Sequence, residues 1–101
     1  MQPNMNMIRE MQKQMERIQK ELGETIIEGQ AGGGLVSVQM TALKQMRGVR
    51  IKPEAIDPDD LELLEDMIVA AVNDAMQKAD EHAQGKLGGL ASGLGMPGLL
   101  G

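Results

Sequence analysis

The spacing of apolar residues predicts a long amphipathic helix near the N-terminus. Over residues 8–22 the apolar side chains recur every three or four positions, at Ile8, Met11, Met15, Ile18 and Leu22. This 3-4-3-4 spacing over two heptads is typical of a helix that packs against another helix. Gly23 follows the last apolar position, where glycine commonly ends a helix. We therefore expect the helix to end there.

A two-residue alternation follows and predicts three short antiparallel strands, at about residues 24–31, 35–42 and 46–52. The second segment is the clearest, because its valines and methionine alternate with Ser37, Gln39 and Thr41. The three consecutive glycines at 32–34 can supply the positive φ angles of a hairpin loop between the first two strands.

A second helix is predicted by its start signals and its apolar period. Asp57 suits the N-cap position and Pro58 the first helical position, and we expect Gly85 to end the helix. Apolar side chains between them recur at helical spacing, at Leu61, Leu64, Ile68, Val72, Ala75 and Ala79. The order α-β-β-β-α, with a three-stranded antiparallel sheet between the helices, predicts an α+β fold.

Length and glycine content predict one small domain followed by a tail. The chain has 101 residues, and seven of its thirteen glycines fall within residues 85–101. We expect a single dimerising domain over residues 1–85 and a flexible tail over residues 86–101, because glycine weakens helices and strands. A core of this size is marginal. No cysteine is available for a disulfide, so the sequence predicts that a partner subunit, most simply in a homodimer, completes the core.

Composition excludes several classes of protein. The chain contains no aromatic residue, so it lacks the base-stacking side chains of the common single-strand binding folds. The N-terminus has no apolar segment typical of a secretory signal, and no apolar run approaches the length of a membrane span. We expect a cytoplasmic protein that does not associate with membranes.

Candidate catalytic and metal-binding groups are sparse. His82 is the single imidazole, and Ser37 and Ser92 are the two serines. We place His82 in the last turn of the second helix, where an imidazolium would favour the helix dipole. The aspartates near residue 57 lack the spacing of a calcium loop, and the glycines at 32–34 lack the Lys-Ser/Thr of a phosphate loop. The sequence predicts no catalytic residue, no cofactor and no metal, and so no enzyme.

Charge is divided unevenly along the chain, whose net charge is −5. Residues 1–52 carry eight bases against five acids, whereas residues 53–101 carry two bases against ten acids. On the first helix four bases fall within an arc of about 80°, almost opposite the apolar positions; they are Arg9, Lys13, Arg17 and Lys20. A phosphate partner would offset the repulsion between like charges spaced by four residues. The alternative is a solvated face with local pairs such as Glu16–Lys20.

A second group of bases lies in the third predicted strand. Arg47 and Arg50 are further candidates for phosphate contacts, and Arg50 and Lys52 share the face opposite Val49 and Ile51. Their alternative role is to protect an edge strand against aggregation. We interpret the acidic residues that follow, at the start of the second helix, as capping groups that favour the positive end of the helix dipole.

Several stretches, in the same order, resemble the YbaB/EbfC family of bacterial nucleoid-associated proteins. They are "EGQAGGGLVSVQM", "VRIKPEAIDPDDLELLEDMIVAAVNDAMQKA" and "GMPGLL", and "LEDMIVAAVNDA" is the most specific. The resemblance covers nearly the whole chain. It implies an α-β3-α protomer, a tweezer-like homodimer with helices as projecting arms, and non-catalytic binding of double-stranded DNA in the nucleoid. It also implies recombination or replication proteins as further partners.

The chain departs from this resemblance at the second hairpin. Thr41 and Ala42 stand where members of the family often carry Asn-Gly, the pair that favours a two-residue turn. We therefore expect a longer turn built from residues 41–45.

The sequence thus predicts a nucleoid-associated protein that binds duplex DNA as a homodimer with loose sequence preference. The residues expected to contact DNA are Arg9, Lys13, Arg17, Lys20, Arg47 and Arg50. The main alternative is an adaptor in DNA recombination or repair that binds proteins through its Met-rich arms or its Gly-Leu tail. A weaker one is an acidic mimic of DNA.

Overall fold

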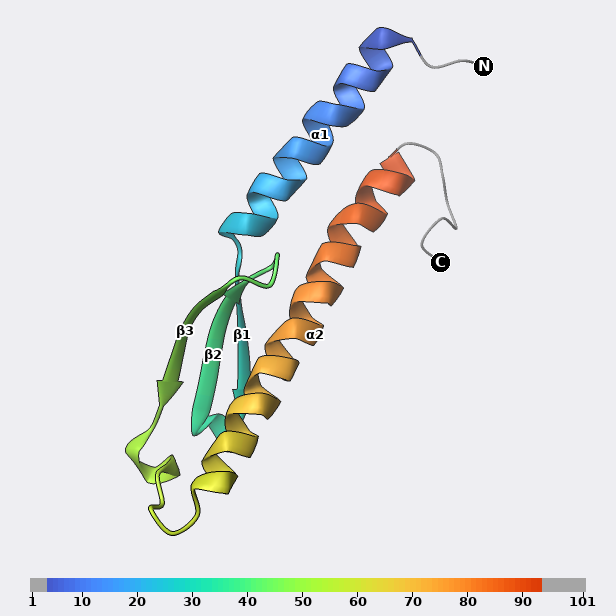
Figure 1. Cartoon of the computed structure of the whole chain (residues 1–101). Coiled ribbons are helices and arrows are strands. Elements are labelled where there is room, and N and C mark those ends of the chain that lie inside the picture. Colours follow the sequence, from blue (N-terminus) through green and yellow to red (C-terminus); the bar gives the residue numbers. More distant parts are fainter. Residues whose placement is uncertain (1–3, 94–101) are drawn as a thin grey trace.

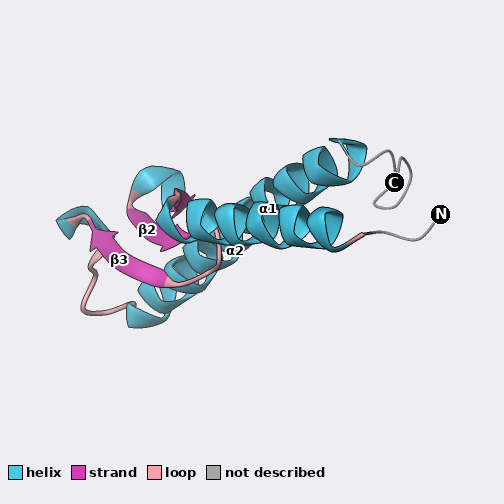
Figure 2. Cartoon of the chain, turned by 90° about the horizontal axis from the view of Figure 1, so that it is seen from above, coloured by secondary structure: helices cyan, strands magenta, loops and turns pink. Residues whose placement is uncertain are grey.

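The computed structural model describes residues 4–93 and has the predicted order of elements (Figure 1). The α+β class is confirmed, since the strands occupy one part of the molecule and helices make up the rest (Figure 2). The elements are α1 (Met5–Glu24), β1 (Ile26–Ala31), β2 (Val36–Thr41), β3 (Met46–Ile51) and α2 (Leu61–Gly93), with short 3-10 turns η1 (Gly32–Gly34) and η2 (Pro53–Ala55).

The three strands form an antiparallel sheet in the order β1-β2-β3. Val38 lies opposite Gly29 on one side and Val49 on the other, so these three residues share a face of the sheet, called here the inner face. Ser37 lies between Gln30 and Arg50 on the opposite, outer face. The predicted strands agree with the observed ones to within two residues at each end.

Both hairpin loops have the predicted character. The φ angles of Gly32, Gly33 and Gly34 are 63°, 67° and 93°, values that side chains disfavour. The second turn uses residues 41–45, as expected from the absence of Asn-Gly. The amide of Thr41 donates to the carbonyl of Gln45 at 2.8 Å, and the Thr41 hydroxyl accepts from the amides of Leu43 and Gln45.

The first helix is longer than predicted at both ends. It begins after Asn4, whose side-chain oxygen accepts a hydrogen bond from the amide of Met7 at 2.8 Å. The predicted end at Gly23 is wrong, because the helix continues to Glu24. Thr25 takes the capping role in an extended conformation: its amide and hydroxyl both donate to the carbonyl of Glu21, at 3.0 and 2.7 Å.

The second helix begins later than predicted. Asp57 is not its N-cap: its carboxylate accepts from the amide of Asp59 at 2.9 Å in the preceding turn. Asp60 has the capping contact, since its carboxylate accepts from the amide of Leu63 at 3.2 Å. Competing Asp side chains in one short segment explain why the sequence pattern misplaced the start.

The predicted end of this helix at Gly85 is also wrong, because α2 continues to Gly93. Each glycine costs about 1 kcal/mol in a helix interior, and α2 nevertheless runs through Gly85, Gly88 and Gly89. Residues 86–93 of the predicted tail are therefore helical, and His82 does not lie in the last turn. The remainder of that predicted tail, residues 94–101, lies outside the described residues.

The core lies between the inner face of the sheet and one ridge of α2. Its buried residues are small or β-branched, apart from Met40: Val36, Val38, Met40, Ala55, Ala71, Ala75 and Ala79. Gly29 of β1 faces this ridge, and a Cβ at this position would fall on the carbonyl oxygen of Ala71 and the amide nitrogen of Ala75. The alanines and the glycine thus bring the helix backbone very close to β1.

This close approach lets two side chains of α2 reach the outer edge of β1. The carboxylate of Asp74 accepts a hydrogen bond from the amide of Gln30 at 2.9 Å, and Lys78 donates to the carbonyl of Glu28 at 3.4 Å. Lys78 and Asp74 also form an ion pair at 3.0 Å. The Gln30 amide, and then Lys78, hold the pKa of Asp74 below its usual value of 3.8.

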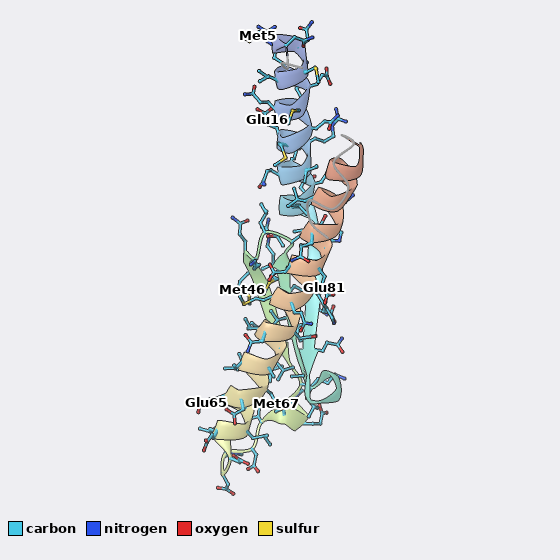
Figure 3. The ribbon with its side chains drawn as sticks, turned by 90° about the vertical axis from the view of Figure 1, so that its right-hand side faces the viewer. Met5, Glu16, Met46, Glu65, Met67 and Glu81 are labelled. Carbon is cyan, nitrogen blue, oxygen red and sulfur yellow. The ribbon has the colours of Figure 1, made fainter. Side chains whose placement is uncertain are left out.

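The molecule is elongated, with principal extents of 66 × 24 × 15 Å. Its radius of gyration is 18.7 Å, whereas a compact domain of this length would have about 13 Å. Figures 1 and 3 show the cause, because α1 and the C-terminal part of α2 extend beyond the same end of the sheet. The chain therefore folds around a small core and leaves much of its length outside it.

The contact of α2 with β1 predicts a specific sensitivity at Gly29. The substitution Gly29→Ala should destabilise the protein by about 3 kcal/mol, because the added methyl group meets backbone atoms of α2 that cannot rotate away. Chemical denaturation measures this change. Gly48→Ala is the matched control: its added methyl group would meet chiefly the flexible end of Gln39, at 3.4 Å. Equal stabilities of the two variants would contradict this packing.

The contact of Asp74 predicts a pH dependence of stability. Because its pKa is lowered in the folded protein, Asp74 contributes its full stabilisation above the unfolded pKa of about 3.8, and this contribution is lost as the pH falls through the folded pKa. Thermal unfolding of Asp74→Asn should therefore give a lower Tm than wild type at neutral pH, with the difference shrinking below about pH 4. Asp66→Asn, at an exposed position of α2, is the control. A difference that stays constant with pH would refute the assignment.

Candidate nucleic-acid interface

Helix α1 is attached to the rest of the protein by its C-terminal end alone. Leu22 is its one buried residue, and its carbonyl accepts from the amide of Ala42 at 3.1 Å. Glu21 forms an ion pair with Lys86 of α2 at 3.7 Å. Toward the N-terminus, from Asn4 to Lys20, every residue except Gln14 and Ile18 is exposed. The helix thus projects as an arm, as the labelled Met5 and Glu16 show in Figure 3.

Four exposed bases form a stripe along this arm. Their positions span about 17 Å of the helix axis, at 1.5 Å per residue. None of them forms an ion pair within residues 4–93, and the expected pair of Glu16 with Lys20 is not formed. We call this set, defined by Arg9, Lys13, Arg17 and Lys20, the α1 stripe.

The opposite side of α1 carries the apolar positions predicted to pack against another helix. Ile8, Met11 and Met15 remain 39%, 42% and 37% exposed and line a shallow depression on the arm. No part of the described chain covers them. The prediction of an apolar helical surface is therefore correct, but the described part of this protomer does not supply its partner.

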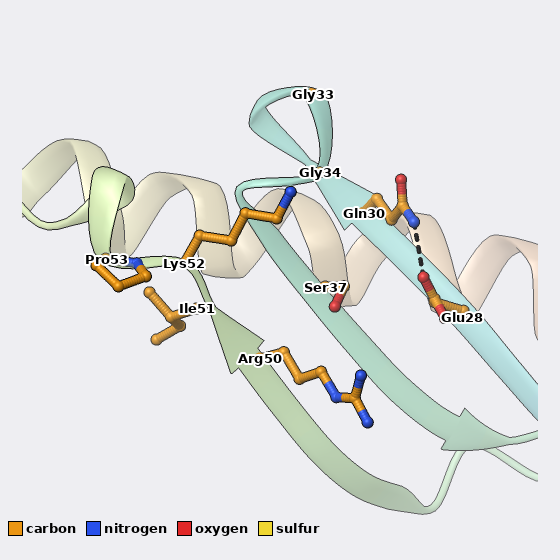
Figure 4. A pocket seen from close by; sticks show the side chains of 9 residues that line it. All are labelled: Glu28, Gln30, Gly33, Gly34, Ser37, Arg50, Ile51, Lys52 and Pro53. Carbon is orange, nitrogen blue, oxygen red and sulfur yellow. Dashed lines mark hydrogen bonds between the residues drawn. The ribbon is translucent and has the colours of Figure 1, made fainter.

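The two arginines of β3 lie toward opposite ends of the strand and are not brought together. The β2–β3 register shifts between Gln39 and Met40, so Arg47 is the unpaired residue of a bulge near the turn. Arg50 lies toward the other end of β3, on the outer face and opposite Ser37. It lines a hollow of about 730 Å³ together with Lys52 (Figure 4). Lys52 shares a face with Arg50 in the sequence pattern, but it was not among the residues predicted to contact DNA.

Strand β3 exposes apolar residues on the inner face of the sheet. Val49 and Ile51 are 46% and 38% exposed, although Val38 and Val36 directly opposite them are fully buried. The reason is that α2 packs on β1 and β2 and leaves β3 uncovered. The inner face of the sheet therefore continues as an open apolar surface beyond the helix.

The flank of α2 next to this surface is also apolar. At about 100° per residue, Val69 and Met76 lie on the side of the helix opposite Asp74 and Lys78. Since Asp74 and Lys78 contact β1, the other flank faces the β3 side. Val69 and Met76 are 58% and 39% exposed. Together with Val49 and Ile51 they form what we call the open apolar surface.

The described residues offer no constellation for catalysis. Ser37 lies on the outer face of the sheet, whereas His82 belongs to the ridge of α2 that contains Ala75 and Ala79, on the inner side. They cannot form a nucleophile–base pair. Within residues 4–93 there is no group of three metal-ligating side chains. None of the helices in that range combines the length and apolar character needed to cross a membrane.

Comparisons with known proteins agree with one another. The sequence profile of the YbaB/EbfC DNA-binding family matches residues 1–94. A nucleoid-associated protein of Acetivibrio thermocellus is 50% identical over 91 residues, covering 89% of this chain and 80% of the relative. One from Roseiflexus sp. (strain RS-1) is 49% identical over 92 residues, covering 91% of each chain.

A solved structure supports the fold. The crystal structure of an uncharacterised protein from Helicobacter pylori superposes with a TM-score of 0.64, covering 77% of this chain and 90% of that one. Its sequence identity is 23%, so the likeness concerns the fold alone. The profile match across nearly the whole sequence and the relatives near 50% identity establish that the chain belongs to the YbaB/EbfC DNA-binding family.

Proposed function

We propose that this protein is a nucleoid-associated homodimer that binds duplex DNA without catalysis, chiefly through the α1 stripe. The observation that carries this proposal is the arrangement of four exposed, unpaired bases on a projecting helix of a chain that belongs to a DNA-binding family. The nucleoid of the cytoplasm is the location that follows, since the relatives are named nucleoid-associated proteins. The adaptor alternative has no comparable support.

Homodimer formation is supported by the two edges of the sheet. The edge of β1 is occupied by Asp74 and Lys78, which satisfy backbone groups that would otherwise pair with another strand. The edge of β3 has no such cover within the described residues. Beside it lies the open apolar surface. A second copy placed against β3 would remove that apolar surface from water and complete the small core.

The mode of DNA binding follows from the kinds of side chain present. Without aromatic residues the protein cannot stack unpaired bases, so a duplex is the expected form of DNA. Lysine and arginine contacts to phosphates position a protein without reading sequence, which gives loose sequence preference. Because the net charge is −5, long-range attraction is weak and binding depends on the local field of the arms. A dimer that contacts about eight phosphates should show a slope of log K against log salt near −7.

The α1 stripe predicts how this salt dependence changes on mutation. Changing Arg9, Lys13 and Arg17 to Ala removes six bases from a dimer, which should make the slope shallower by about 5. Fluorescence anisotropy with a short duplex at several salt concentrations measures it. The control changes Lys44 and Lys86 to Gln, two lysines that are paired with carboxylates and lie outside the α2–β1 contact. A slope that stays at the wild-type value in the Ala variant would exclude α1 from the interface.

The open apolar surface predicts which residue holds the dimer together. Val49→Glu should weaken dimerisation by about 3 kcal/mol or more, over a hundredfold in Kd, because a carboxylate would be buried without a partner. Ile26→Glu is the control, since Ile26 is also an apolar residue, 55% exposed, but lies on the outer face. Sedimentation of both variants gives their association states. A dimer equally strong in both variants would place the subunit contact elsewhere.

A further inference from the structure

The outer face of the sheet carries a basic hollow that lies apart from the α1 stripe. It is open, about 730 Å³ in volume, and is lined by polar residues of all three strands and by the backbone of Gly33 and Gly34 (Figure 4). We propose that this hollow is a second phosphate-binding site, which holds the DNA backbone through Arg50, Lys52 and Ser37. The proposal rests on the proposed function, and it adds Lys52 and Ser37 to the interface.

The register of the sheet brings these three residues together. Ser37 and Arg50 are direct partners in the β2–β3 ladder and project from the same face. Lys52 follows two positions later, and its amide donates to the carbonyl of Leu35 at 2.9 Å, which fixes its backbone beside β2. In Figure 4 the side chain of Arg50 extends from β3 toward β2, which carries Ser37, and the ammonium group of Lys52 ends near Gly34. Guanidinium, ammonium and hydroxyl groups thus line one hollow.

The charges in the hollow are available to an anion. Within residues 4–93, neither Arg50 nor Lys52 forms an ion pair, whereas Lys44, Lys78 and Lys86 all do. The single acid of the lining is Glu28, on the far strand, where its carboxylate already accepts from the side-chain amide of Gln30 at 2.6 Å. An arginine can bind a phosphate through two parallel hydrogen bonds, and a neighbouring lysine adds a second charge.

Protection of a free edge strand is the alternative role of these charges, since inward-pointing charges also deter edge-to-edge pairing. In the proposed homodimer a second copy lies against β3, so no free edge is left there to protect, and Arg50 and Lys52 extend toward β2 (Figure 4). The hollow also has no aromatic residue that could stack a base. Its chemistry therefore suits a phosphodiester backbone, which needs positive charge and hydrogen-bond donors alone.

The hollow and the α1 stripe lie at different ends of the sheet. The hollow adjoins η1 and the end of β3, while α1 leaves the sheet at the end that carries the β2–β3 turn (Figure 1). Substitutions in one region do not touch the other. Their effects on DNA binding can therefore be measured separately.

The test uses the full chain and a short DNA duplex. Changing Arg50 and Lys52 together to Gln should make the slope of log K against log salt shallower by about 2 for each protomer, as expected for the loss of two phosphate contacts. The control changes Lys44 and Lys86 to Gln, removing the same charge from lysines paired with carboxylates. Glu28→Gln provides a test of opposite sign: it should tighten duplex binding by roughly twofold at low salt, because it removes a negative charge from the rim.

The outcomes separate this proposal from the proposed function. If the wild-type protein does not bind duplex DNA, the proposed function fails. Suppose instead that wild type binds, that the Arg50/Lys52 variant keeps the wild-type slope and that Glu28→Gln leaves the affinity for DNA unchanged. The hollow is then not a phosphate site, and the α1 stripe is the one proposed DNA contact that remains.

NMR spectra recorded with the duplex should show shifts at the amides of Ser37 and Arg50. Shifts there with a poly-glutamate peptide, but not with DNA, would overturn the choice of a nucleic-acid ligand.

Discussion

The close contact between α2 and β1 determines how the rest of this protein is arranged. Three alanines form one ridge of the helix, two of them, Ala71 and Ala75, face Gly29 on the strand, and the small size of these residues brings the two backbones together. At this distance Asp74 and Lys78 reach past the strand and bond to its outer edge. The helix is thereby fixed over β1 and β2, and its position decides which surfaces of the protein stay open.

A single helix held over β1 cannot cover a sheet of three strands. Neighbouring strands lie about 4.8 Å apart and a helix with its side chains is about 10 Å wide, so the third strand keeps its apolar face in contact with water. Val49 and Ile51 of β3 are accordingly exposed, while their partners on β2 are buried. The same arrangement leaves one edge of the sheet occupied and the other open. An incomplete core, an open edge and a projecting arm are thus linked consequences of one packing contact.

Net charge is a poor guide to the chemistry of this surface. The chain is acidic overall, yet seven of its fifteen acids lie within residues 54–66, around the first turn of α2 and at the end of the sheet from which α1 does not project (Figure 1). The bases on α1 and those above the outer face of the sheet have no carboxylate partners within the described residues. Local fields of this kind act over about 10 Å at moderate salt. Contacts with an anionic polymer can therefore form on a protein whose total charge opposes them.

Much of the fold could be predicted from local pattern, because helix period, strand alternation and turn residues are properties of neighbouring positions. The helices, the three strands, the glycine loop and the long second turn were all predictable in this way. Helix ends were less predictable: α1 includes Gly23, and α2 continues through Gly85, Gly88 and Gly89, because the rest of each helix can offset a cost of about 1 kcal/mol per glycine. The α1 stripe was also predictable, since four bases on one helix need no tertiary information to share a face.

The tertiary structure decided what the strand residues do. Periodicity placed Arg50 and Lys52 on the face opposite Val49 and Ile51. It did not show that α2 covers β1 and β2 but not β3. Nor did it show that Arg47 lies in a bulge, away from Arg50. Those features depend on strand register and on how closely a helix can approach, and both are set by residues distant in sequence, such as Gly29 and Ala75. The sequence by itself therefore determined the elements and the basic face of α1. The open apolar surface and the basic hollow exist only once the sheet and the helix are packed together.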